Sequence, residues 1–206
     1  MIVYAESNFV LELAFLQEEC TQAEQIVGLA ESREVQLIIP AFSGSEPYES
    51  MIRRKNRRRE LHDRLAAEIR ELKRSSPYTG IDDTTRGLNV ILSESASEEK
   101  ARLDAAIVRL TNISTMIPLT SEVLRASIDY QGQFALGPQD AIVFASVVSH
   151  LQSLNSGEPK LFVTRNSRDF SNQDIKDLLL THNCELLFRF ADAAGYIQSR
   201  LRRDAQ

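Results

Sequence analysis

Four acidic side chains stand where an apolar run of the sequence ends or where a helix is expected to begin. They are Glu6, Glu46, Asp140 and Asp169. If the apolar runs form parallel strands, their carboxyl ends meet at one rim of the sheet, where ligands of open α/β sheets bind. Carboxylate oxygens suit Mg²⁺ or Mn²⁺, and these ions activate water and stabilise charge during phosphodiester displacement. The four acids therefore predict a divalent-metal site.

Each acid also has a simpler structural interpretation. Glu6 can be a polar strand terminus, and Asp140 can favour the dipole at the start of its helix. Glu46 stands three residues after Ser43 and can close a capping box. Asp169 can form an Asx-turn. The joint occurrence of four acids at strand and helix ends favours the metal site over four separate explanations.

Five short apolar runs predict the strands that position these acids. They are residues 1–5, 35–39, 115–119, 160–164 and 184–188. Helical patterns separate the runs, which is typical of an α/β fold with a central parallel sheet between two helical layers. The chain has no repeat and no low-complexity linker, so we expect a single domain over residues 1–206.

A helical insertion is expected within this domain from about residue 47 to 135. Its first helix should begin after residues 41–49 and end near Lys73. Its apolar stripe recurs at helical spacing. The stripe consists of Leu61, Leu65, Ile69 and Leu72. A loop is predicted at 79–83 and a polar turn at 155–157.

The composition excludes several classes of protein. The net charge of −5 argues against general affinity for nucleic acids. The eight glycines form no nucleotide-binding loop. Cys20 and Cys184 suggest neither a disulfide framework nor a zinc site, and they predict a reduced, cytoplasmic setting. No signal peptide is expected, and no run is long and apolar enough to span a membrane.

Six cations fall within the seven residues 53–59. Four of them are the candidates for RNA binding: Arg53, Arg54, Arg57 and Arg58. Close to a metal rim, such a run fits an arm that contacts phosphates. The alternative is a solvated helix start, paired with the acids that follow. These acids are Glu60, Asp63, Glu68 and Glu71.

Three parts of the sequence resemble the PIN domain family of metal-dependent nucleases, which includes many prokaryotic toxins of toxin–antitoxin pairs. The matching residues are 3–9, 40–46, and 139–141 together with 164–170. The resemblance implies a Mg²⁺- or Mn²⁺-dependent endoribonuclease with Glu6, Glu46, Asp140 and Asp169 as its metal-binding and catalytic acids. Asn8 would orient the first acid, and Thr164 and Asn166 would support the last.

Two departures from the family pattern matter. Glu6 stands where the family usually has Asp, so the site must accommodate one more methylene group. Asn166 occupies a position that is often acidic, which leaves Asp169 as the remaining carboxylate. These departures keep open an RNA- or protein-binding module with little catalysis. The resemblance implies an RNA substrate and, if the chain is a toxin, an antitoxin protein, and the sequence leaves a homodimer open.

Overall fold

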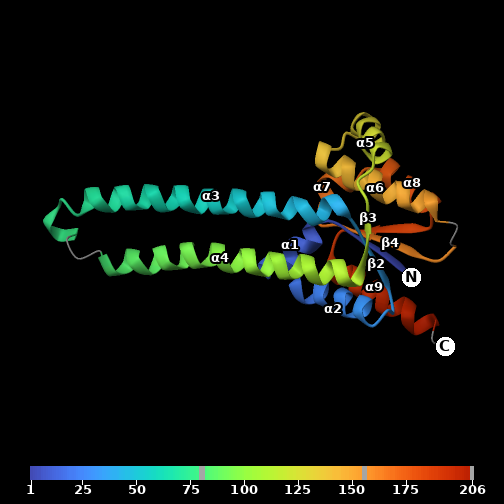
Figure 1. The fold of residues 1–206 in the computed structure, drawn as a ribbon, viewed down its shortest axis with the longest axis horizontal. Coiled ribbons are helices and arrows are strands. Elements are labelled where there is room, and N and C mark those ends of the chain that lie inside the picture. The colour runs from blue at the N-terminus through green and yellow to red at the C-terminus, as the bar shows by residue number, and fades with distance from the viewer. Residues whose placement is uncertain (79–81, 155–156, 205–206) are drawn as a thin grey trace.

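The computed structural model describes residues 1–78, 82–154 and 157–204, and it contains one sheet of five parallel strands (Figure 1). The strands are β1 (Ile2–Ala5), β2 (Gln36–Pro40), β3 (Ser114–Ile117), β4 (Lys160–Val163) and β5 (Cys184–Leu187). Their order in the sheet is β3-β2-β1-β4-β5. The chain therefore runs outward from β1 to β3 and then returns to the other side of β1, which places a topological switch point between β1 and β4.

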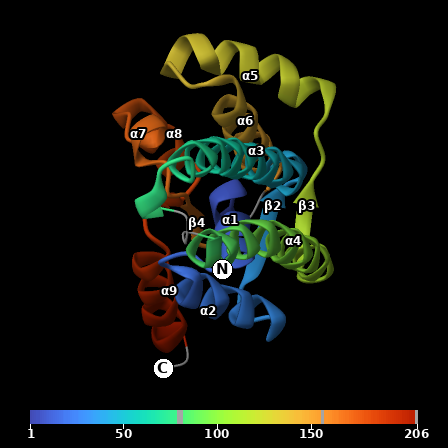
Figure 2. The same cartoon turned by 90° about the vertical axis from the view of Figure 1, so that its left-hand side faces the viewer.

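Helices cover both faces of the sheet, as Figure 2 shows, so the predicted three-layer α/β/α fold is confirmed. One layer contains α1 (Ser7–Phe15), α2 (Cys20–Glu31) and α9 (Phe190–Asp204). The other contains α5 (Ser121–Phe134), α6 (Pro138–Ser153), α7 (Ser167–Phe170) and α8 (Gln173–Thr181).

The strands divide their side chains between two cores because successive residues of a strand point to opposite faces. In β1, Val3 and Ala5 pack in the core under α1, α2 and α9, whereas Ile2 and Tyr4 pack against α6. All four are buried. Burial on both faces explains why these strands appear in the sequence as nearly continuous apolar runs.

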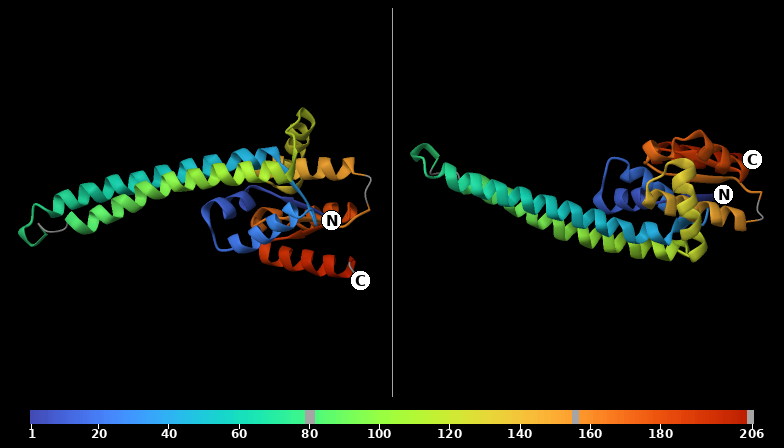
Figure 3. Two further views of the ribbon diagram at one scale, coloured as in Figure 1. Left: turned by 60° about the horizontal axis from the view of Figure 1, so that its bottom comes forward. Right: turned by 90° about the horizontal axis from the view of Figure 1, so that it is seen from above.

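A long helical hairpin projects from this body (Figure 1, Figure 3). It consists of α3 (Ala41–Leu72), the short 3-10 helix η1 (Ser76–Tyr78) and α4 (Asp82–Ile113). The 32 residues of α3 correspond to about 48 Å of helix. Only the base of the hairpin packs against α1 and the core, through residues such as Met51 and Leu103.

The start of α3 differs from the prediction. The helix begins at Ala41, directly after β2, and continues through Pro47, so the start expected after residues 41–49 is wrong. Pro47 lacks the N–H that a helix would direct to Ser43, which is why a sequence pattern places the boundary there. Because α3 starts early, Glu46 lies within the helix.

Beyond its base the hairpin is thinly packed. Between Ile52 and Glu98, none of the side chains whose exposure the structure describes is buried. Leu61 and Leu72 of the predicted apolar stripe are 51% and 44% exposed, because α4 covers only one side of α3. A charged contact joins the two helices instead: Arg58 donates to both oxygens of the buried Glu99 at 2.8 and 2.6 Å.

The strand predicted at 115–119, within the region from 47 to 135, is confirmed: β3 pairs with β2 at the edge of the sheet. The loop predicted at 79–83 and the turn predicted at 155–157 include residues 79–81 and 155–156, which lie outside the described residues. Asp82 and Asp83 belong to α4, so the loop prediction is wrong for these two residues. Within the described part of the chain, no single helix is long and apolar enough to cross a membrane. The helices α5 and α6 meet that test only as a pair, and they are bent by 114°.

Candidate active site

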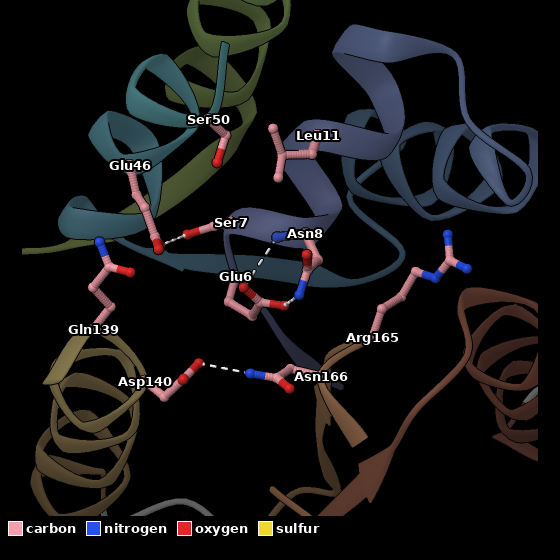
Figure 4. A pocket seen from close by; sticks show the side chains of 10 residues that line it. All are labelled: Glu6, Ser7, Asn8, Leu11, Glu46, Ser50, Gln139, Asp140, Arg165 and Asn166. Carbon is pink, nitrogen blue, oxygen red and sulfur yellow. Dashed lines mark hydrogen bonds between the residues drawn. The ribbon is translucent and has the colours of Figure 1, made fainter. Parts of the chain in front are cut away.

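A polar cleft of about 340 Å³ lies beyond the carboxyl ends of β1 and β4, at the switch point of the sheet (Figure 4). Side chains from β1, α1, α3, α6 and the segment after β4 line it. They are Glu6, Ser7, Asn8, Leu11, Glu46, Ser50, Gln139, Asp140, Arg165 and Asn166. Three of the four predicted acids therefore surround one cleft, although they lie up to 134 positions apart in the sequence.

Glu6 is the most enclosed of these acids. It forms the N-cap of α1, where Asn8 donates from its backbone N at 3.0 Å and from Nδ2 at 2.7 Å. Thr164 Oγ1 donates a third hydrogen bond at 3.0 Å. Burial nevertheless raises the pKa of Glu6 from 4.5 to about 7, because desolvation of the carboxylate outweighs these three donors. The charge of the nearby Glu46 also raises the pKa of Glu6, by a smaller amount.

Glu46 faces Glu6 from the second turn of α3 and accepts a hydrogen bond from Ser7 Oγ. Burial raises the pKa of Glu46, Ser7 opposes the shift, and the charge of Asp140 adds to it. The capping-box alternative is excluded, because Ser43 lies inside α3 and Pro40 occupies the N-cap. Glu49, the neighbouring acid, is 57% exposed and lies outside the cleft lining.

Asp140 enters the cleft from the first turn of α6, and Asn166 Nδ2 donates to its Oδ1 at 2.9 Å. Burial raises the pKa of Asp140, and the charge of Asp169 contributes in the same direction. The backbone N of Asn166 also donates to Thr164 Oγ1 at 2.9 Å. The end of β4 therefore links Glu6 and Asp140 through one hydrogen-bonded chain.

Asp169 occupies a different position from the other three acids. It lies half-buried on α7, close enough to Asp140 to influence its pKa, but it does not line the cleft. The support that Thr164 and Asn166 were expected to give to Asp169 goes instead to Glu6 and Asp140. The reason is that the turn after β4 directs these two side chains toward β1 and α6. A metal-binding role for Asp169 stays a prediction.

The donor set of the cleft fits a hard divalent cation. It offers carboxylate, amide and hydroxyl oxygens, which are the ligands of Mg²⁺ and Mn²⁺. Within the described residues, no three His, Cys, Asp or Glu side chains are gathered closely enough to form a ready-made ion site. Mg²⁺ usually keeps several waters and uses one or two carboxylates, so an open cleft with spaced acids is compatible with such an ion.

Five residues of the lining were not identified from the sequence. They are Ser7, Leu11, Ser50, Gln139 and Arg165. Three of them, Ser7, Gln139 and Arg165, are adjacent in the sequence to predicted site residues, and this adjacency could have identified them. Ser50 follows Glu46 by four residues and shares its helix face, but that relation appears only once α3 is known to begin at Ala41.

The cations at residues 53–59 of α3 lie in different environments. Arg58 is held by Glu99, and the Arg54 guanidinium lies 4.3 Å from the ring centre of Phe15. Arg53 contacts Ser50 at 3.2 Å and Glu49 at 3.7 Å. Lys55, Arg57 and Arg59 are exposed and form no ion pair within the described part of the chain. The four acids expected to neutralise the run contact none of its described members.

A comparison with known protein families gives one match. The family model for the PIN domain matches residues 3–170, which extend from β1 through the hairpin to the end of α7. No curated protein sequence matches the chain.

Proposed function

Because the chain belongs to the PIN domain family, whose members are generally nucleases that use divalent metals, we propose that it is a Mg²⁺- or Mn²⁺-dependent endoribonuclease. The observation that supports this proposal is the cleft itself. Glu6, Glu46 and Asp140 line it from three separate elements, and burial raises the pKa of all three carboxyl groups. Carboxyl groups whose pKa is raised by burial within a cleft are typical of functional sites.

Glu6 and Asp140 would hold the ion, Asp169 would contribute from the α7 side, and Glu46 would hold the ion or orient the attacking water. The ion would supply an activated water and would neutralise charge at the phosphate. The chain's own polar residues position these acids: Asn8 and Thr164 fix Glu6, Asn166 fixes Asp140, and Ser7 fixes Glu46.

Single-stranded RNA is the proposed substrate because a basic track leads away from the cleft along α3. Arg57 and Arg64 follow Glu46 by 11 and 18 residues, which correspond to about three and five full helical turns. They therefore project from the face of α3 that lines the cleft, and both are exposed. Lys55 and Arg59 project from about the opposite face. The acids Glu60 and Glu68 lie near the track. Its positive charge is therefore confined to the immediate surroundings of Arg57 and Arg64.

Cleavage of a labelled single-stranded RNA in Mn²⁺ tests the proposal. Glu6→Gln and Asp140→Asn should each lower the cleavage rate by roughly 10- to 100-fold or more. This is the usual loss when residues around a metal site are replaced. Glu49→Gln is the matched control, because it removes an acid just outside the cleft and should leave the rate unchanged. Undiminished cleavage by Glu6→Gln or Asp140→Asn would contradict the assignment of that residue. As a toxin, the wild-type chain should arrest growth when it is expressed, whereas Asp140→Asn should not.

An RNA-binding module without catalysis is the second candidate. It is favoured by one observation: Glu6 already serves as the cap of α1 and receives three hydrogen bonds within the protein. Such a module would bind the same RNA equally well in EDTA and in Mn²⁺ and would leave it intact.

A further inference from the structure

One cation lies at the edge of the acidic cleft. Of the described residues that line it, Arg165 alone carries a positive charge, against the carboxyl groups of Glu6, Glu46 and Asp140. Figure 4 shows Arg165 on the α1 side of the cleft, across from Glu46. A phosphodiester entering this cleft brings further negative charge, so a fixed cation at its edge would reduce the repulsion.

Glu12 anchors this cation. Its side chain is fully buried in α1, where it accepts a hydrogen bond from the backbone N of Glu19 at 3.1 Å and pairs with Arg165 Nη1. A buried carboxylate requires such partners. The pair therefore holds the guanidinium at a defined place beside the cleft.

Glu18 forms a weaker contact with the other terminal nitrogen of the guanidinium. Its carboxylate accepts from Arg165 Nη2 at 3.0 Å, but its side chain is 84% exposed. Exposed ion pairs of this kind contribute little free energy. A guanidinium has five N–H donors, and the described contacts of Arg165 occupy two of its nitrogens. A phosphate can replace Glu18 while Glu12 keeps its place.

We propose that Arg165 positions a phosphate of the substrate in the cleft, with Glu12 as its fixed anchor and Glu18 as an exchangeable partner that the phosphate displaces. The inference rests on the proposed nuclease function and adds a positioning residue to the same site. Arginine is suited to this task because its planar donors match two phosphate oxygens at once. The contact reads the RNA backbone and not the bases, so it is independent of sequence.

Binding of a fluorescent single-stranded RNA, measured by anisotropy in EDTA to prevent cleavage, tests the proposal. Glu18→Gln should lower the Kd by about twofold to fivefold, because the phosphate no longer competes with a carboxylate. Glu24→Gln is the matched control, since it removes an equal charge from a residue that pairs with Arg109 outside the cleft. Arg165→Met should raise the Kd by about tenfold or more and reduce the log–log salt slope by about one.

A purely structural role of Arg165 predicts a different pattern. Arg165→Met lowers the melting temperature under either role, because it leaves the buried Glu12 without its cation, but a purely structural role leaves the Kd of Glu18→Gln equal to that of Glu24→Gln. That equality overturns the proposal even if Arg165→Met fails to fold. If the wild type binds RNA but neither variant changes the Kd, only this inference fails. A wild type that neither binds RNA in EDTA nor cleaves it in Mn²⁺ would overturn the proposed function along with it.

Discussion

The replacement Glu6→Gln tests whether burial destabilises the ionised form of the Glu6 carboxyl group. The pKa of Glu6 is about 7 in the folded protein, against 4.5 for an ordinary Glu, and burial is the main cause. Between these two values the folded protein keeps a proton that the unfolded chain has released. The metal-free protein therefore loses stability as the pH rises through this window.

The size of the effect follows from the gap between the two pKa values. At 1.36 kcal/mol per pKa unit, this gap corresponds to about 3 kcal/mol, most of which is lost between about pH 5 and about pH 8. Glu6→Gln removes this contribution. The amide also places an N–H₂ group among the donors of Asn8 and Thr164, which costs about 1–3 kcal/mol at every pH.

Urea unfolding in EDTA separates the two effects, because only the first depends on pH. The stability of wild type relative to Glu6→Gln should fall by about 2–3 kcal/mol from pH 5 to pH 8. In millimolar Mn²⁺ the decline should disappear, because a bound ion favours the ionised carboxylate. Parallel pH curves for the two proteins in EDTA would refute the idea that Glu6 is destabilised by burial.

Two further predictions concern the ion and the RNA track. Asp140→Asn should melt at or above the wild-type temperature in EDTA, because burial raises the pKa of Asp140 and Asn166 can still donate to an amide oxygen. It should lose most of the stabilisation by Mn²⁺, which at 100 times Kd amounts to about 2.7 kcal/mol, or about 5–10 °C for a chain of this size. A lower melting temperature in EDTA with a full Mn²⁺ shift would mean that Asp140 is a structural cap. The double replacement Arg57→Ala/Arg64→Ala should weaken RNA binding and reduce the log–log salt slope by about two. Lys55→Ala/Arg59→Ala on the opposite face should leave the slope nearly unchanged, and equal effects of the two pairs would argue against a track on α3.

The sequence by itself determined the strands, the order of the layers and the family. The runs at 1–5, 35–39 and 160–164 are apolar because both faces of these strands are buried, and that pattern is local. The position of Glu6 and Asp140 at the ends of such elements is local as well. The prediction that polar groups gather at one rim needed only the parallel topology, which helices between the strands already imply.

Only the tertiary structure determined which side chains form hydrogen bonds and ion pairs with each other. Thr164 was expected to support Asp169 but donates to Glu6, because β4 lies next to β1 in the sheet. Arg165 meets Glu12 across 153 positions of sequence, and Arg58 meets Glu99 across 41 positions. Periodicity and spacing describe neighbours along one element, whereas these pairs depend on strand order and on how α1, α3 and α4 pack. The same limit hid the early start of α3: Pro47 is a local signal against a helix, and the helix that continues through it places Glu46 in the cleft.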